Sequence, residues 1–98
     1  MKTFRFLEFD CTYSLGEYTH GGTAIRIIDA NDRMPVATAS VWIPNLREDE
    51  IAIKDYSENE GILDALVEAD IVYPPHRSEN GFPVVKLNKF TLHNHLNE

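Results

Sequence analysis

The sequence predicts an α+β domain that has a mainly antiparallel β-sheet of about five strands and one packed α-helix. Short segments with alternating apolar residues recur along the chain, which is typical of half-buried strands. Turn-forming residues separate these segments at short intervals, which favours antiparallel pairing. One longer segment, residues 57–69, instead repeats its apolar residues at helical spacing.

Three strands are expected in the first half of the chain. They cover residues 3–9, 23–29 and 36–43, with a bulge in the first near Glu8. The glycines at 21 and 22 permit a tight reversal before the second strand. Residues 30–33 are rich in turn formers, so the second and third strands should form a hairpin.

The second half should contain the helix between two further strands. Residues 51–54 predict a short fourth strand and residues 82–87 the last one, with a possible strand at 71–73 and a polar loop at 76–81 between helix and last strand. Ser57 followed by Glu60 fits a capping box, which places the helix start at Ser57. The expected apolar stripe of the helix is Ile62, Leu63, Leu66, Val67 and Ala69. We expect one domain over residues 1–88 and an extended or frayed tail over residues 89–98.

The net charge of −7 is confined to one region. Residues 44–70 contain nine acidic and two basic residues, whereas the rest of the chain has seven of each. This distribution argues against direct binding of nucleic acid, which requires clustered Lys and Arg. It favours attraction to a basic protein surface. The alternative is that the acidic residues serve only to keep a small protein in solution.

The composition also indicates where the protein functions. No apolar run is long enough to span a membrane, and no secretory signal opens the chain. Cys11 is the only cysteine, so no disulfide can form within the chain, as is typical of cytoplasmic proteins. Its position in an apolar alternation favours packing as a small hydrophobic residue over nucleophilic reactivity. We therefore expect a cytoplasmic protein without membrane contact.

No residue pattern completes a catalytic or metal site. Asp55, Glu58 and Glu60 could hold a hard cation weakly, but helix capping and dipole interactions explain them as well. His93 and His95 supply two ligands, fewer than a zinc site usually needs. Nucleophile elbows, P-loops and dinucleotide fingerprints are missing from the sequence. The sequence therefore predicts no enzyme, no catalytic residue, no metal and no cofactor.

A family resemblance covers roughly residues 22–88. The string IKDYSENEG at residues 53–61, continued by ALVEA at 65–69, resembles a signature of small uncharacterised proteins carried by phages, plasmids and conjugative elements. Residues 23–25, 37–39 and 78–87 are also similar to that family. The family has no settled activity, so the resemblance implies a mobile-element setting and a fold without a mechanism.

These observations predict a non-enzymatic accessory protein that acts by protein–protein interaction through an acidic surface. The expected partner is a host protein with a basic surface, such as a nucleic-acid-binding defence nuclease, which makes an anti-CRISPR-like inhibitor a candidate. The predicted binding residues are Asp55, Tyr56, Glu58, Asn59, Glu60, Asp64 and Glu68. A purely structural role for the turn at residues 56–61 is one alternative. Others are a self-associating protein that uses sheet edges or an aromatic patch around Trp42 and Tyr73, and a small metal-dependent enzyme.

Overall fold

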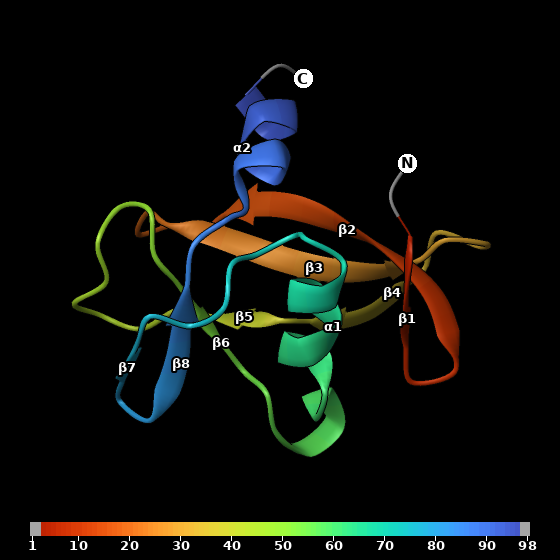
Figure 1. Ribbon diagram of the computed structural model, residues 1–98, viewed down its shortest axis with the longest axis horizontal. Coiled ribbons are helices and arrows are strands. Elements are labelled where there is room, and N and C mark those ends of the chain that lie inside the picture. The colour runs from red at the N-terminus through yellow and green to blue at the C-terminus, as the bar shows by residue number, and fades with distance from the viewer. Residues whose placement is uncertain (1–2, 97–98) are drawn as a thin grey trace.

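Two four-stranded antiparallel sheets form the body of the protein (Figure 1). The computed structural model describes the backbone of residues 3–96 and the side chains of residues 3–94. The strands are β1 (Phe4–Phe6), β2 (Phe9–Glu17), β3 (Thr23–Asp29), β4 (Pro35–Thr38), β5 (Ser40–Val41), β6 (Ile51–Ile53), β7 (Arg77–Glu79) and β8 (Phe82–Val85). The predicted α+β class is confirmed. The prediction of a single sheet of about five strands is corrected to two sheets.

The first sheet has the strand order β1-β2-β3-β4. Its first two strands replace the single strand predicted over residues 3–9. The pairing of Phe6 with Phe9 leaves Leu7 and Glu8 as a two-residue hairpin turn. The reversal was missed because Leu7 gives no sequence signal for a turn, yet it adopts a left-handed backbone with φ of 55°. The turn predicted after β3 is confirmed, and β3 and β4 form the expected hairpin.

The second sheet has the strand order β5-β6-β8-β7. Strands β7 and β8 form a hairpin that closes at Asn80 and Gly81, so the loop predicted over residues 76–81 is corrected to a strand and a turn. Both turn residues have positive φ, 53° and 82°, which is the conformation that an Asn-Gly pair favours. The predicted strand at 71–73 is reduced to one bridge between Val72 and Leu87.

The chain passes from one sheet to the other at Ala39. The strand predicted over residues 36–43 is therefore two strands: β4 pairs with β3, and β5 pairs with β6. Ala39 is fully buried, and its amide donates to the Ile25 carbonyl at 2.9 Å. Its carbonyl accepts the Lys54 amide at 2.8 Å. This one residue is thus hydrogen-bonded to segments of both sheets.

Side chains satisfy the backbone groups on either side of this junction. Asn59 Nδ2 donates to the Thr38 carbonyl at 2.7 Å. Ser40 Oγ accepts the Ile25 amide at 2.9 Å and lies 2.7 Å from the Tyr18 hydroxyl. The Asn59 amide, the Ser40 hydroxyl and the Ile25 amide are therefore paired although these residues are buried, and an unpaired buried group would cost about 1–3 kcal/mol.

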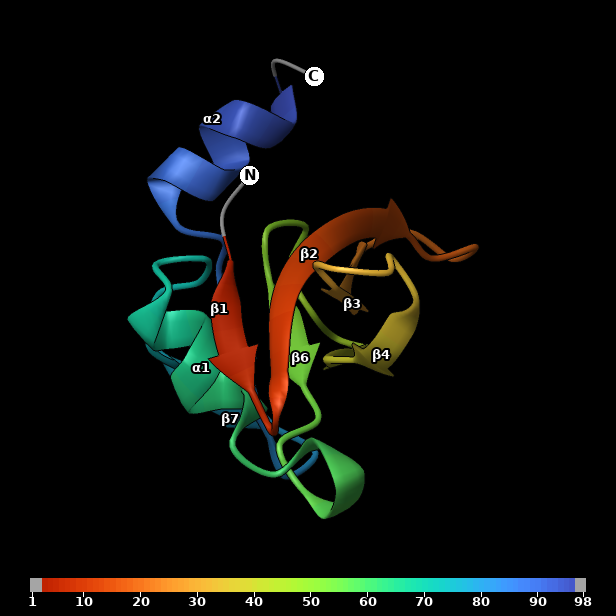
Figure 2. The same cartoon turned by 90° about the vertical axis from the view of Figure 1, so that its right-hand side faces the viewer.

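The helical segments are η1 (Ser57–Asn59), α1 (Ile62–Glu68) and α2 (Lys89–Leu96). Figure 2 shows α1 beside β1, where Ile62 and Leu66 are fully buried. The predicted single helix is thus corrected to two α-helices and a 3₁₀ turn. Residues 89–96, for which an extended or frayed tail was predicted, form α2, which projects from the body in Figure 1. Among residues 3–96, neither α-helix is long and apolar enough to cross a membrane.

The core lies between the sheets and α1. Its larger fully buried side chains include Ile25, Ile27, Ile53, Ile62, Leu66, Ile71 and Val85. Cys11 is also fully buried, which confirms that it packs as an apolar residue. Burial raises the pKa of its thiol, so the reactive thiolate is disfavoured.

Replacing Asn59 with Ala should destabilise the fold. The substitution removes the hydrogen bond from the buried Asn59 amide to the Thr38 carbonyl next to the sheet junction, and we expect a loss of about 0.5–1.5 kcal/mol in the free energy of unfolding. Urea denaturation measures this loss. Asn31→Ala, at an exposed turn position, is the control and should change stability by less than about 0.5 kcal/mol. Equal effects of both substitutions would contradict the role assigned to Asn59.

Candidate binding surface

The start of α1 is determined by Asp55. Its Oδ1 accepts the amides of Gly61 at 3.0 Å and Leu63 at 3.1 Å, which are otherwise unpaired groups of the first helical turn. Gly61 precedes the helix with φ of 92°, and a Cβ at this position would contact nothing within 4 Å. Glycine is therefore favoured at this position because the backbone is left-handed, and not because a side chain would lack space.

The predicted capping box of Ser57 and Glu60 is wrong. Ser57 opens the 3₁₀ turn with φ of 56°, and no side-chain hydrogen bond caps that turn. Glu60 follows the turn and is exposed. The Ser-x-x-Glu spacing was misleading because the intervening residues form their own turn before Gly61 starts the helix.

Three exposed acidic residues lie on α1 or just before it, and we call them the acidic row: Glu60, which precedes the helix, and Asp64 and Glu68, which belong to it. Asp64 and Glu68 are four residues apart, so they lie on the same side of the helix. The apolar residues Ile62 and Leu66 point the other way, into the core. Among the salt bridges between described residues, none involves a member of the acidic row.

The other predicted binding residues have partners inside the protein. Glu58 Oε1 is 2.6 Å from Lys54 Nζ, and this hydrogen bond lowers the pKa of Glu58 and raises that of Lys54. The same ammonium lies 5.5 Å from the ring centroid of Tyr56. Asn59 is only 2% exposed and Asp55 caps α1. Of the seven predicted binding residues, the members of the acidic row are therefore the exposed carboxylates that have no salt bridge with another described residue.

Glu50 forms a buried ionic cluster that the sequence did not reveal. Its side chain is fully buried, and both carboxylate oxygens are bound by Arg77: Nη2 is 2.7 Å from Oε1, and Nε is 2.9 Å from Oε2. His76 Nε2 is 2.6 Å from Oε2, and the Arg47 amide donates to Oε1 at 2.9 Å. The hydrogen bonds from Arg77, followed by those from His76 and Arg47, hold the pKa of Glu50 well below its usual range.

This cluster reduces the charge that the acidic region presents to solvent. Glu50 is neutralised by Arg77, which lies outside residues 44–70 and also binds Glu79. Asp49 similarly lies 3.3 Å from Lys86. No local sequence signal indicates these pairs, because each joins residues far apart in the chain. The exposed acidic residues of this region that form no salt bridge with a described residue are therefore the acidic row, Glu48 and Asp70.

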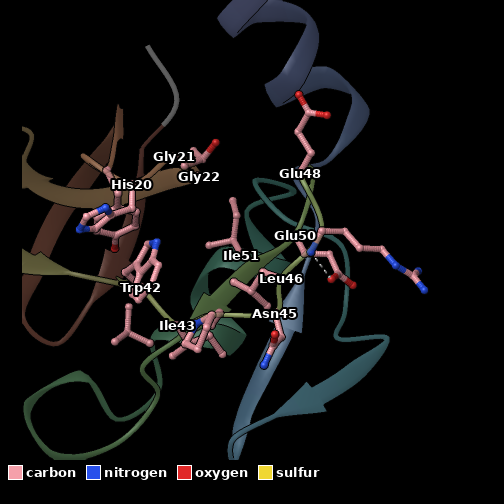
Figure 3. Close-up of a pocket in the computed structure, with 16 residues that line it drawn as sticks. His20, Gly21, Gly22, Trp42, Ile43, Asn45, Leu46, Glu48, Glu50 and Ile51 are labelled. Carbon is pink, nitrogen blue, oxygen red and sulfur yellow. Dashed lines mark hydrogen bonds between the residues drawn. The ribbon is translucent and has the colours of Figure 1, made fainter.

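A cavity of about 270 Å³ lies beside Glu50 (Figure 3). His20 and Trp42 lie on one side of it, with ring centroids 5.6 Å apart, and Ile43, Leu46 and Ile51 lie on the other. The Glu50 carboxylate is already bound by Arg47, His76 and Arg77. The lining is thus mainly aromatic and aliphatic, which suits packing of an apolar group better than acid–base chemistry.

The histidines and the aromatic residues named in the sequence analysis lie apart. His20 stacks on Trp42, His76 binds Glu50 and His93 is exposed on α2; the side chain of His95 lies outside the described residues. Within residues 3–94, no three His, Cys, Asp or Glu side chains are arranged to hold a metal ion. Trp42 and Tyr73 are each about two-fifths exposed but line different cavities.

Comparison with protein-family models, curated proteins and solved structures gives no match to this chain.

Replacing Asp55 with Ala should destabilise α1 more than replacing Ser57 with Ala. Asp55→Ala removes the acceptor of two helix-start amides, and we expect a loss of about 1 kcal/mol in unfolding free energy. Ser57→Ala removes no cap and should change it by less than about 0.5 kcal/mol. Urea denaturation of both variants measures the difference. The reverse order would restore the Ser57 capping box.

Replacing Glu50 with Gln should lower the free energy of unfolding near neutral pH. It should also make that free energy depend less steeply on pH in the acidic range. We expect a loss of about 2–3 kcal/mol near neutral pH, because Arg77 and His76 lose their buried anion. Because the pKa of Glu50 is lowered from its ordinary value of 4.5, the ionised side chain stabilises the folded state, and this stabilisation is fully present above pH 4.5. That contribution falls as the pH drops below this value, because the unfolded chain then binds the proton first. Urea denaturation at a series of pH values from about 7 to about 3 measures both effects.

The control is Glu48→Gln, which neutralises an exposed carboxylate two residues away. This variant should keep the stability of the parent near neutral pH and its steep loss in acid. If Glu50→Gln and Glu48→Gln have the same pH profile, the buried cluster is not the source of the acid sensitivity.

Proposed function

We propose that this chain is a non-enzymatic binding protein that attaches to a basic surface of a partner protein through the acidic row. The observation that carries this proposal is the contrast between Glu60, Asp64 and Glu68 and four of the acidic residues around them. Glu50, Asp49 and Glu58 have cationic partners within the fold, and Asp55 caps a helix. The acidic row has no such partner among the described residues.

The spacing of the row supports an external partner. Asp64 and Glu68 lie four residues apart on α1, and such a pair of carboxylates repels and weakens the helix by about a few tenths of a kcal/mol. Internal pairing would offset that repulsion, as Lys54 does for Glu58. A partner surface rich in Lys and Arg would offset it in the complex, and it would also accelerate association by electrostatic steering.

The class of partner follows from the charge together with the family resemblance. A mobile-element protein encounters host defence nucleases, whose nucleic-acid channels are lined with basic residues. Carboxylates in a row can occupy such a channel in place of backbone phosphates. An inhibitor of a host defence nuclease, of the anti-CRISPR kind, is therefore our specific candidate, acting in the cytoplasm.

Reversing the charge of the acidic row should abolish partner binding. The variant Glu60→Lys/Asp64→Lys/Glu68→Lys would repel a basic surface, so we expect at least a tenfold fall in the partners recovered from a bacterial lysate. In a cleavage assay with a purified CRISPR nuclease and its guide RNA, the parent protein should reduce cleavage and the variant should not. Mass spectrometry of the recovered proteins and gel analysis of the cleaved DNA measure the two results.

The matched control is Glu17→Lys/Glu48→Lys/Asp49→Lys, which changes three exposed acidic residues outside α1 and away from the β1–β2 turn and gives the same net charge. It should retain partner binding. Equal recovery of partners by the parent and the acidic-row variant would refute the acidic row as the binding surface. Equal loss in both triple variants would show that only the net charge matters.

A further inference from the structure

Two hairpin turns at one end of the molecule expose large apolar side chains. Leu7, in the β1–β2 turn, and Met34, in the β3–β4 turn, are each 61% exposed. Phe9, which opens β2, is 37% exposed. Figure 2 looks onto this end of the molecule. Together with Phe6 and Pro35, these residues line a cavity of about 290 Å³, which we call the hairpin cavity.

Leu7 is an unfavourable residue for its position. A two-residue hairpin turn with positive φ favours Gly, Asn or Asp, because their side chains tolerate the left-handed backbone. Leu7 has φ of 55° and contributes little to the core, since most of its surface is exposed. Asn or Gly at position 7 would therefore give a more stable turn than Leu. A strained residue that is also exposed points to a function for its side chain.

The lining of the hairpin cavity is acidic as well as apolar. Its charged members are Asp29, Asp32 and Glu58, and no Lys, Arg or His is among its described lining residues. Asp29 accepts the Asn31 amide and Asp32 accepts the Met34 amide, which fixes both carboxylates in the turn. Glu58 is paired with Lys54, so the negative charge of the lining comes from Asp29 and Asp32, and the cation of Arg33 follows Asp32 in the same turn.

The charge decides between two kinds of occupant. A second copy of this chain would bring another protein of net charge −7 towards an acidic rim, and the two would repel. A segment with Lys or Arg beside an apolar residue would complement both the rim and the lining. The hairpin cavity therefore fits a foreign basic segment better than a copy of this chain.

We propose that the hairpin cavity binds a large apolar side chain of the partner, such as Leu or Phe, that is flanked by Lys or Arg. This inference rests on the proposed function, in which the partner has a basic surface, and it adds an apolar anchor to that contact. Leu7, Phe9 and Met34 would close around the anchor, while Asp29 and Asp32 would meet the flanking cations. The strain at Leu7 would then be retained because its side chain is used in binding.

Met34 provides a direct probe of this site. The chain has only two methionines, Met1 and Met34, so methyl ¹³C labelling of methionine gives a simple NMR spectrum. Three synthetic peptides serve as ligands: GKKLFKKG, the acidic analogue GEELFEEG and the polar analogue GKKSNKKG. We expect GKKLFKKG to shift the Met34 methyl signal saturably. The acidic analogue should not shift it, and the polar analogue should bind at least about tenfold more weakly.

The variant Leu7→Asn separates binding from folding. Asn accepts the left-handed backbone, so the melting temperature should stay the same or rise. The affinity for GKKLFKKG should nevertheless fall about tenfold, because part of the apolar lining is lost. Unchanged affinity in this variant, no saturable shift with GKKLFKKG, or equal binding of GEELFEEG would overturn the proposal. A Met34 shift that depends on protein concentration without peptide would assign the cavity to a second copy instead.

The acidic-row variant makes the two proposals distinguishable. If it loses lysate partners but its Met34 signal still responds to GKKLFKKG, both sites are supported. If it keeps its lysate partners while the peptide response persists, the acidic row fails and the hairpin cavity stands. If GKKLFKKG does not bind the parent protein, the hairpin cavity fails whatever the acidic row does.

Discussion

The whole structure depends on the hydrogen-bonded crossing at Ala39. Each described strand belongs to one sheet only, and Ala39 is the single residue between β4 of the first sheet and β5 of the second. The backbone of this residue therefore hydrogen-bonds toward both sheets. Its amide binds the first sheet at Ile25 and its carbonyl binds Lys54 beside the second. Two neighbouring backbone groups are bound by side chains: the Ile25 amide donates to Ser40 Oγ, and the Thr38 carbonyl accepts from Asn59 Nδ2. Because Asn59 belongs to the 3₁₀ turn before α1, the same junction also holds this turn against the sheets.

The Glu50 cluster performs a similar task for the second sheet. Glu50 lies just before β6, and Arg77 opens the edge strand β7, so their paired charges join the two across the sheet. A buried carboxylate is tolerated here because each of its oxygens has at least two donors. This pairing lowers the negative charge that the acidic region can offer to a partner. Its net charge is not uniformly available to a partner, because part of it holds the fold together.

The sequence predicts well those elements whose signals are local. The alternation in β3 and β6 and the apolar residues of α1 were read correctly, since burial follows from residue type. The Asn80-Gly81 pair is itself a local signal for the hairpin between β7 and β8. In contrast, the turn at Leu7 contradicts its residue type. Glu50 and Arg77 are 27 residues apart in the chain, so no local sequence pattern indicates that they form a pair. Of the predicted site, the placing of Asp64 and Glu68 on one side of α1 follows from their spacing. The spacing indicates neither that Glu60 lies before the helix nor that Asn59 is buried.

Departures from local rules divide into two kinds in this protein. Ser57 adopts positive φ, Glu50 is a buried charge and Asn59 is a buried amide, and each neighbourhood contains the hydrogen bonds that compensate. Leu7 and the acidic row also depart from what local stability favours, but nothing among the described residues compensates for them. Natural sequences tend to keep such conflicts at functional sites. The absence of internal compensation, more than charge or exposure alone, is therefore what distinguishes these two surfaces as places where a partner would complete the structure.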